Sequence, residues 1–133
     1  RLAGDPEILA EDLLQERFLA REEGSGTRVL MQRFLERIGG GRAFEVIEMG
    51  TNETIKQSVM AGLGIAMISA HTCLTEIADR HLVALPVAGL PLVRQWFLLN
   101  RSDRELTRAA QKFREFILER RGKLLPKLSA YGF

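Results

Sequence analysis

The stretch EMGTNETIKQSVMAGLGIAMIS at residues 48–69 contains the alternation that decides the fold. It completes a run rich in β-forming residues at 43–49, turns, and then places apolar side chains at helical spacing until two glycines stop the helix. The almost wholly apolar run that follows, at 65–68, is typical of a strand buried on both faces of a parallel sheet. The stretch therefore predicts a strand, a helix and a second strand in succession.

The same alternation continues on both sides of this stretch. The expected strands lie at 18–21, 43–49, 65–68, 82–87 and 92–99, and the expected helices at 26–38, from 52 to Gly62, at 71–79 and from 102 to near Arg121. Three glycines at 39–41 end the first helix, because they disfavour continued helix and allow the positive φ of a C-cap. This order predicts the α/β class, with a mostly parallel sheet and helices on both of its faces.

The last expected helix has clear signals at both ends. Ser102 and Glu105 form a capping box that would satisfy two N–H groups at its start. Gly122 and Pro126 follow where a helix stop is expected. The side chains expected on its buried face are Leu106, Ala109, Ala110, Phe113 and Ile117. Trp96, in the preceding apolar run, is also expected in the core.

Size and charge exclude several classes of protein. The chain has 133 residues, with 19 Lys and Arg against 17 Asp and Glu, so the net charge of +2 does not indicate a strongly basic nucleic-acid binder. The single cysteine, Cys73, excludes an internal disulfide, is expected to be a small buried residue, and fits the reducing cytoplasm. No apolar run is long enough for a membrane span and no secretory signal opens the sequence. Because it begins with Arg1 rather than Met, we expect a piece of a longer protein.

The strongest candidate for a binding site is the turn after the first strand, GSGTR at 24–28. Its glycines would let a ligand approach the backbone closely, and the N–H groups of Ser25, Gly26 and Thr27 would point outward from a helix start. Arg28 could add a bidentate contact to an anion. The alternative reading, which the pattern leaves open, is a helix cap with no ligand.

A second turn, Gly50-Thr51-Asn52, carries small polar groups before the next helix, where Thr51 or Asn52 can cap. Ligands in open α/β sheets bind beyond the carboxyl ends of the strands, and both turns follow such ends. Ser69, at the end of the run at 65–68, is a third candidate for the same edge. Convergent donors are what an anion site needs, so the two turns strengthen each other.

No pattern in the sequence points to catalysis, to a metal or to a cofactor. His71 and His81 lack further ligands at the spacing of a zinc site, and no nucleophile stands near a base in a known motif. The basic residues near the end are expected to be a solvated helix terminus rather than a nucleic-acid groove; they are Arg114, Arg120, Arg121, Lys123 and Lys127. An enzyme is therefore not expected.

Two motifs, EGSGTR at 23–28 and the stretch at 48–69, resemble the effector-binding domain of LysR-type transcriptional regulators. The sequence GLPLVRQWF at 89–97 resembles the branch that regulates RuBisCO operons, the carbon-fixation genes of the Calvin cycle. The resemblance extends from about Leu2 to Leu118. It implies a fold like type 2 periplasmic binding proteins, in which two α/β subdomains joined by two crossing strands hold an effector in their cleft.

The resemblance also implies a division of this chain. Residues 1–16 would be the hinge or entry segment from a first subdomain, and 17–93 the second effector-binding subdomain. Residues 94–133 would be the returning strand and C-terminal helix that belong to the first subdomain. The winged helix-turn-helix that binds DNA is not among these residues.

The implied function is that of a non-catalytic effector sensor. The effector-binding residues carried over from the family are Ser25, Gly26, Thr27, Arg28, Gly50, Thr51, Asn52 and Ser69. The implied effector is a small anionic metabolite, either a phosphorylated Calvin-cycle intermediate or NADPH. The implied assembly is a homodimer or tetramer that reaches promoter DNA only through the N-terminal domain. A solute-binding protein of a transport system, with the same fold, is the alternative.

Overall fold

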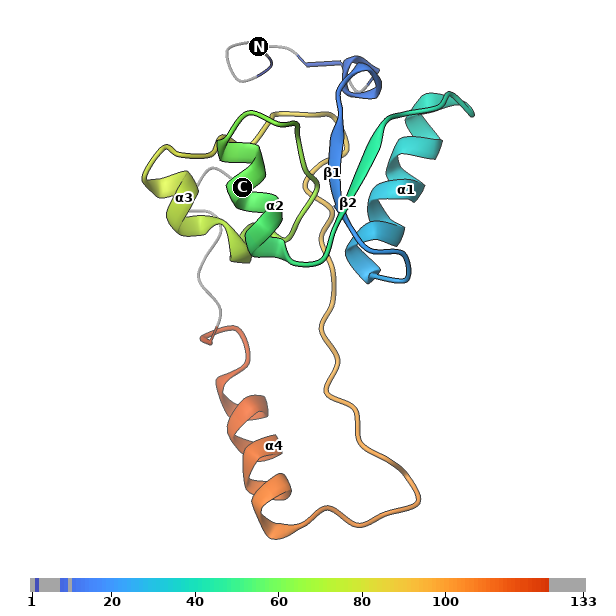
Figure 1. Cartoon of the computed structure of the whole chain (residues 1–133). Helices are drawn as coiled ribbons and strands as arrows, with labels where there is room; N and C mark the ends of the chain where they lie inside the picture. Colours follow the sequence, from blue (N-terminus) through green and yellow to red (C-terminus); the bar gives the residue numbers. More distant parts are fainter. Residues whose placement is uncertain (1, 3–7, 10, 125–133) are drawn as a thin grey trace. The chain divides into compact units, whose positions relative to one another are not determined.

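A computed structural model describes residues 2, 8–9 and 11–124 of the chain (Figure 1). Contacts between residues divide the chain into two compact units, the first running through Pro91 and the second covering Leu92–Lys127. Each unit is described by itself.

The first unit is organised around a small parallel sheet. Strand β1 (Phe18–Arg21) pairs with β2 (Val46–Met49) in a register that places Phe18 beside Val46 and Arg21 beside Met49. On the other side of β1, Phe18 forms a parallel bridge with Ile65, and the Leu19 amide donates to the Ile65 carbonyl over 2.8 Å. Three chain segments therefore run in the same direction, with β1 in the middle.

Helix α1 (Gly26–Gly39) covers one face of this sheet. Its buried side chains Met31, Phe34 and Leu35 belong to one apolar cluster with Phe18 and Ala20 of β1. The helix ends as expected at the glycine run, where Gly40 takes the left-handed conformation with φ of 55°. The predicted strand at 18–21 and the predicted helix at 26–38 are both confirmed.

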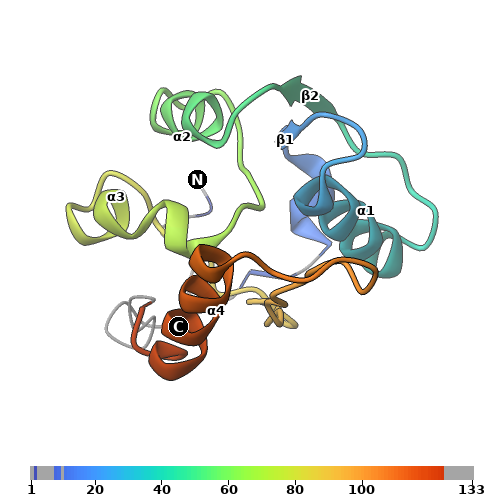
Figure 2. The same cartoon turned by 90° about the horizontal axis from the view of Figure 1, so that it is seen from below.

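Helix α2 (Asn52–Met60) lies on the opposite side of the sheet from α1 (Figures 1 and 2). Thr51 is its cap, because the Thr51 hydroxyl oxygen accepts a hydrogen bond of 3.0 Å from the Thr54 amide. Ile55 of α2 and Leu19 of β1 are both fully buried, and neither belongs to the cluster under α1. Since alternate side chains of a strand point to opposite faces, both faces of β1 are covered. The predicted parallel sheet with helices on both faces is confirmed.

The chain returns beside β1 through Gly64, which packs closely against the backbone. A Cβ atom at this position would lie 2.4 Å from the Arg17 carbonyl oxygen and 3.2 Å from Leu19 Cγ. Only glycine lets the segment approach β1 so closely that the Ile65 amide donates to the Arg17 carbonyl over 2.9 Å.

Four expected strands are shorter or absent in the described residues. The run at 43–49 is a strand only over Val46–Met49. The run at 65–68 makes only the bridge at Ile65 and is half-buried rather than central to a larger sheet. The run at 82–87 makes only a parallel bridge between Val87 and Ile8. The run at 92–99 has no strand pairing and is almost entirely exposed. The physical reason is shared, because an apolar run becomes a strand only where a neighbouring segment supplies hydrogen bonds.

The expected helix at 71–79 is also shorter than predicted. A 3-10 turn, η3 (Ala70–Thr72), precedes a brief helix α3 (Leu74–Ala78). A further 3-10 turn, η2 (Asp12–Gln15), precedes β1. Cys73, between η3 and α3, is buried as expected.

The second unit contains an extended segment and helix α4 (Arg108–Arg120). The predicted capping box is wrong: the cap lies five residues after Ser102, at Thr107, whose hydroxyl oxygen accepts a 3.2 Å hydrogen bond from the Ala110 amide. Asp103 is engaged instead with Arg101, whose Nε donates to Asp103 Oδ1 over 2.8 Å. Gly122 has the positive φ expected after a helix, and Pro126 lies outside the described residues.

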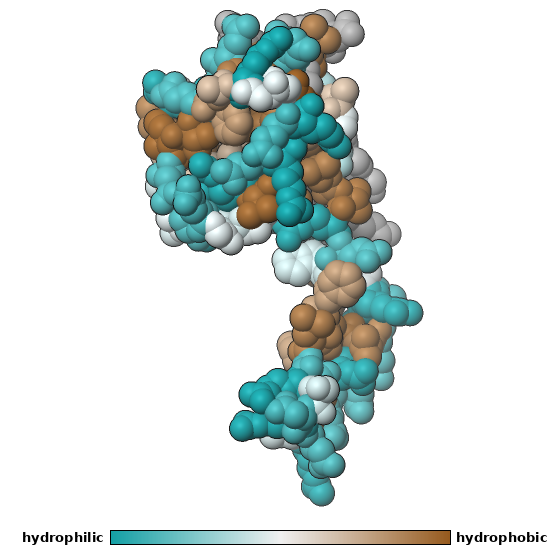
Figure 3. All heavy atoms as spheres, turned by 90° about the vertical axis from the view of Figure 1, so that its right-hand side faces the viewer, coloured by the Kyte–Doolittle hydropathy of each residue, from teal (hydrophilic) through white to brown (hydrophobic). Residues whose placement is uncertain are grey.

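The predicted buried positions of the second unit are wrong as well. None of the residues in α4 is buried, and Phe113 is 60% exposed. Trp96 is 80% exposed rather than in the core. Hydrophobic side chains of this unit are visible as brown areas in the lower part of Figure 3. The helical spacing identified an apolar face, but the described residues of the unit cover it only in part, since Leu106, Ala110 and Ile117 are half-buried and Phe113 is exposed.

Candidate functional site

The two glycine-containing turns lie at one edge of the sheet. The first connects β1 to α1, and the second connects β2 to α2. Because β1 and β2 are parallel and aligned, both turns leave the sheet at its carboxyl edge, Arg21 being paired with Met49 immediately before them. The backbone amide of Glu23 reaches across this edge and donates to Glu48 Oε2 over 3.3 Å. The structure thus brings seven of the eight candidate residues, Ser25 to Arg28 and Gly50 to Asn52, to neighbouring positions in the topology.

The two turns differ in how their helix starts are satisfied. Thr51 uses its hydroxyl to cap α2, whereas Ser25, in the equivalent position before α1, makes no hydrogen bond with its side chain to the helix start. Gly24 takes a positive φ of 85° ahead of Ser25, a conformation that favours glycine. The first turns of both helices place backbone N–H groups and the positive end of the helix dipole at the same edge. That combination favours negatively charged groups.

Arg28 is the most informative of the candidate side chains. Its Nε and Nη1 atoms are buried and have no hydrogen-bond partner in the part of the chain that the structure describes. Buried polar groups are normally satisfied, and an unpaired guanidinium is costly. Arg28 therefore has two donors near the start of α1 that are available for a hydrogen bond to an anion.

Arg21 was missed by the sequence reasoning, although it is the last residue of the predicted first strand. Its Nη1 donates to Asn52 Oδ1 over 3.3 Å, which links the end of β1 to the turn before α2. Its Nε and Nη2 donate to the two carboxylate oxygens of Glu22, each over 2.7 Å. These hydrogen bonds raise the pKa of Arg21 and lower the pKa of Glu22. The signal that could have found Arg21 was its place at the end of the predicted first strand.

Ser69 reaches the same edge by a different route. Because Ile65 is aligned with Phe18 in a parallel bridge, the segment that ends at Ser69 runs in the direction of β1. The Ser69 carbonyl accepts a 2.7 Å hydrogen bond from the Thr72 hydroxyl, and the Cys73 thiol lies 3.6 Å from the same oxygen. Burial raises the pKa of the Cys73 thiol. These contacts hold the backbone of Ser69 at the start of the 3-10 turn.

An ion cluster joins α2 to α3. Lys56 Nζ lies 2.5 Å from Glu76 Oε1 and 2.8 Å from Glu53 Oε2, and only a tenth of the Lys56 side chain is exposed. Hydrogen bonds to Glu53 and Glu76 raise the pKa of Lys56, and the hydrogen bond from Lys56 lowers the pKa of Glu76. The cluster ties the segment after Ser69 to the helix that begins at the second turn.

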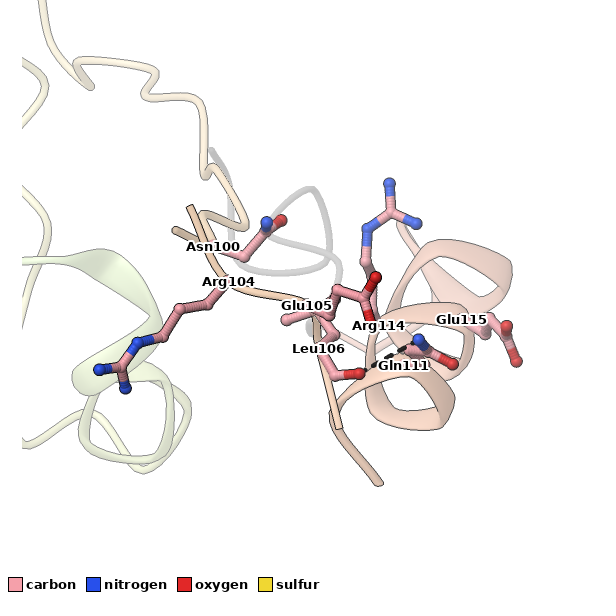
Figure 4. Close-up of a pocket in the computed structure, with 7 residues that line it drawn as sticks. All are labelled: Asn100, Arg104, Glu105, Leu106, Gln111, Arg114 and Glu115. Carbon is pink, nitrogen blue, oxygen red and sulfur yellow. Dashed lines mark hydrogen bonds between the residues drawn. The ribbon is translucent and has the colours of Figure 1, made fainter. Parts of the chain in front are cut away.

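An open hollow in the second unit is a separate feature (Figure 4). It lies between the start of α4 and the chain before it, where Gln111 Nε2 donates to the Leu106 carbonyl over 3.1 Å. Its lining residues are Asn100, Arg104, Glu105, Leu106, Gln111, Arg114 and Glu115. None of the eight candidate residues lines it, and its two arginines are balanced by two glutamates.

The described residues contain neither a candidate metal site nor a candidate membrane-spanning helix. No group of three or more His, Cys, Asp and Glu side chains there is arranged to hold a metal ion. In the same part of the chain, none of the helices has the length and apolar character that a membrane span requires.

Comparison with known proteins gives a consistent set of similarities. The sequence pattern of the LysR substrate binding domain matches residues 1–122. The HTH-type transcriptional regulator CbbR of Cereibacter sphaeroides is 50% identical over 125 residues, which are 94% of this chain and 40% of that protein. The RuBisCO operon transcriptional regulator of Allochromatium vinosum is 42% identical over 92% of this chain and 40% of its own length. The chain thus spans about two fifths of these relatives.

A solved structure shows the same architecture. The regulatory domain of CcmR from Synechocystis PCC6803, in complex with 2-PG, superposes with a TM-score of 0.81 at 33% sequence identity. The match covers 92% of this chain and 59% of that one.

Proposed function

Because this chain belongs to the LysR substrate-binding domain family, we propose that it is the effector-sensing part of a bacterial transcription regulator that controls carbon-fixation genes. The similarity to regulators of RuBisCO operons supports the choice of target genes. Since these relatives are transcription regulators, they favour this function over the transport-type solute-binding protein. The protein would act in the cytoplasm and would bind its effector without transforming it.

The observation that carries the proposal is that two donors of Arg28, Nε and Nη1, have no hydrogen-bond partner in the described residues. Arg28 lies in the first turn of α1, which begins at the same sheet edge as α2. We propose that the effector contacts Ser25, Gly26, Thr27 and Arg28 on the first turn. The contacts on the second and third segments would come from Gly50, Thr51, Asn52 and Ser69. Backbone N–H groups would bind the anion, and Arg28 would neutralise its charge.

The effector class follows from these donors. Amide groups, helix dipoles and guanidinium groups together suit phosphate, with its several oxygen acceptors and double charge. A phosphorylated Calvin-cycle intermediate or NADPH fits this description, and the small anion 2-PG bound by the CcmR regulatory domain supports it. No separate cofactor is part of the proposal.

The remaining architecture is proposed from the exposed apolar surface of the second unit. Val93, Trp96 and Leu99 are 94%, 80% and 85% exposed, which is unusual for side chains of this size in a run of seven residues. We propose that residues 94–133 complete a first subdomain, that 1–16 enter from it, and that 17–93 form the second. The effector would then bind between the two subdomains.

Regulation would follow from a shift between cleft arrangements. An effector that binds one arrangement more tightly changes the populations by its differential affinity. In a homodimer or tetramer, that shift would change how the N-terminal helix-turn-helix domains are placed on promoter DNA.

The proposal is tested by calorimetric titration of the full-length regulator with 2-PG and with NADPH. We expect at least one of them to bind, and Arg28→Ala to weaken that binding about 10-fold to 100-fold, because hydrogen bonds to a charged group are lost. Arg33→Ala is the matched control, since Arg33 is an exposed arginine on the same helix. Absence of binding by either ligand, or equal affinities for the wild type and Arg28→Ala, contradicts the proposal.

A further inference from the structure

Arg21 lies at the proposed effector edge, but the two donors best placed to bind an anion already have a partner. Nε and Nη2, the two donors that form a fork, both bond the carboxylate of Glu22 at 2.7 Å. This bidentate geometry is the one by which a guanidinium binds a free carboxylate or phosphate. Glu22 therefore stands where an oxyanion of a ligand would bind Arg21.

The position of Arg21 makes this contact relevant to the ligand. Arg21 is paired with Met49 at the ends of the two strands, immediately before the turns that lead to α1 and α2. Its third donor, Nη1, bonds Asn52 Oδ1 at the start of α2 over 3.3 Å. Asn52 thus holds the guanidinium at the second turn while Glu22 covers the fork.

The pair between Arg21 and Glu22 is suited to exchange. The side chains are 26% and 42% exposed, so water can replace either partner as the other leaves. Ion pairs this exposed contribute little to stability, and the two residues are adjacent, so releasing Glu22 does not disturb the packing of β1. By contrast, Lys56 is only a tenth exposed in its ion pair with Glu76, where exchange would uncover a buried charge.

We propose that Arg21 is a further effector-binding residue and that Glu22 competes with the effector for it. This proposal rests on the proposed function. An incoming phosphate displaces the Glu22 carboxylate from Nε and Nη2, while Nη1 keeps its bond to Asn52. Because Glu22 is tethered beside Arg21, it competes at a high local concentration. A simple carboxylate ligand would only replace one carboxylate by another, whereas a phosphate dianion brings more charge and more acceptor oxygens. Glu22 thereby sets both the affinity and the preference for phosphate.

The test compares two adjacent carboxylates in the full-length regulator. Glu22→Gln removes the competitor, and Glu23→Gln removes the same charge from an exposed neighbouring side chain that does not bond Arg21. Calorimetry with 2-PG, NADPH and inorganic phosphate should show binding about threefold to fivefold tighter for Glu22→Gln. Glu23→Gln should change the affinity by less than about 1.5-fold, because an exposed charge at that distance is screened.

A double-mutant comparison isolates the contribution of Arg21. Arg21→Gln should weaken phosphate binding. The double variant with Arg21→Gln and Glu22→Gln should then differ in affinity from Arg21→Gln alone by no more than Glu23→Gln differs from the wild type. If Arg21→Gln fails to fold, the comparison of Glu22→Gln with Glu23→Gln decides alone. If the two variants have equal effects, or if Glu22→Gln binds more weakly than the wild type, Glu22 is not a competitor. The proposed function still stands in that case, provided that the wild type binds. No binding of any of the three ligands, by the wild type or the variants, overturns both.

Discussion

The two units of the chain differ in how far they bury similar apolar side chains. In the first unit, Phe34 of α1 is 3% exposed and packs in a cluster with strand β1. In the second unit, Phe113 of α4 is 60% exposed, although its helix has an equally regular apolar stripe. The difference lies in the partners, because α1 has a sheet to cover and α4 has none within its own unit.

This contrast shows what the helical spacing of apolar residues does and does not specify. A stripe of apolar side chains fixes which face of a helix must be covered, and most helical stability comes from that packing rather than from propensity. It does not say where the covering surface lies in the chain. In the first unit, the sheet covers the apolar face of α1. For α4 of the second unit, the covering surface would come from the rest of the proposed first subdomain.

The largest expected effect comes from the core of the first unit. Leu35 is 1% exposed under the sheet, so Leu35→Ala should lower the free energy of unfolding by about 2–5 kcal/mol through lost burial and a cavity. Leu99→Ala, at an 85% exposed position of the second unit, should change it by less than about 0.5 kcal/mol in this 133-residue chain. Urea unfolding of both variants measures the contrast. Equal losses would mean that the two units do not differ as described.

The next effect comes from the close approach of the backbone at Gly64. Gly64→Ala would place a Cβ atom 2.4 Å from the Arg17 carbonyl, and we expect a loss of about 1–3 kcal/mol as the segment moves away from β1. Gly50→Ala is the control, since a Cβ there meets no atom within 4 Å. The same unfolding experiment applies, and a neutral Gly64→Ala variant would contradict the packing of this segment on the sheet.

The helix caps allow the same bond to be tested in both units. Thr51→Ala should cost about 1 kcal/mol, because the cap of α2 is coupled to the packed core of the first unit. Thr107→Ala removes an equivalent bond to Ala110, but no residue of α4 is buried. We therefore expect that variant to reduce helicity by circular dichroism without moving the main unfolding transition. A shift of that transition by Thr107→Ala would show that α4 unfolds together with the first unit.

A smaller effect is expected from acid. Because Lys56 lowers the pKa of Glu76 in the folded protein, ionised Glu76 stabilises the fold above its usual pKa of 4.5. This contribution is lost as the pH falls through the depressed folded-state pKa. Glu76→Gln should therefore flatten the pH dependence of stability below about pH 4.5, measured by thermal unfolding across the acid range.

Asp103 gives the matching control for the acid experiment in the second unit. Its pKa is also lowered, by a hydrogen bond from Arg101, but both side chains are more than half exposed. Asp103→Asn should leave the acid profile nearly unchanged, since exposed pairs contribute little. A larger change for Asp103→Asn than for Glu76→Gln would reverse the expected order of the two regions.

The sequence predicted the elements whose partners lie nearby in the chain. β1, α1 and α2 were found because their spacing, glycine stops and caps are local signals. The runs at 82–87 and 92–99 have the same apolar composition, but pairing is a long-range property and the described residues supply little of it. The start of α4 was misplaced because Ser102 and Thr107 both suit a cap, and spacing alone does not choose between them.

The candidate site was predictable in place but not in detail. The two turns were identified because they follow strands, and the parallel register brings them to one edge. The unpaired state of Arg28 and the fork between Arg21 and Glu22 were not predictable, because they depend on side-chain placement across that edge. That the eight candidate residues bind an effector stays a prediction.

The most direct test of that prediction is amide hydrogen exchange of the full-length regulator with and without 2-PG. If the effector binds at the carboxyl edge, the amides of Gly26, Thr27 and Arg28 and those of Thr51 and Asn52 should exchange more slowly when 2-PG is present. Residues 111–119 of α4 should show no comparable slowing at the hollow of Figure 4. Binding of 2-PG that slows exchange around that hollow, and leaves the two turns unchanged, would contradict the account.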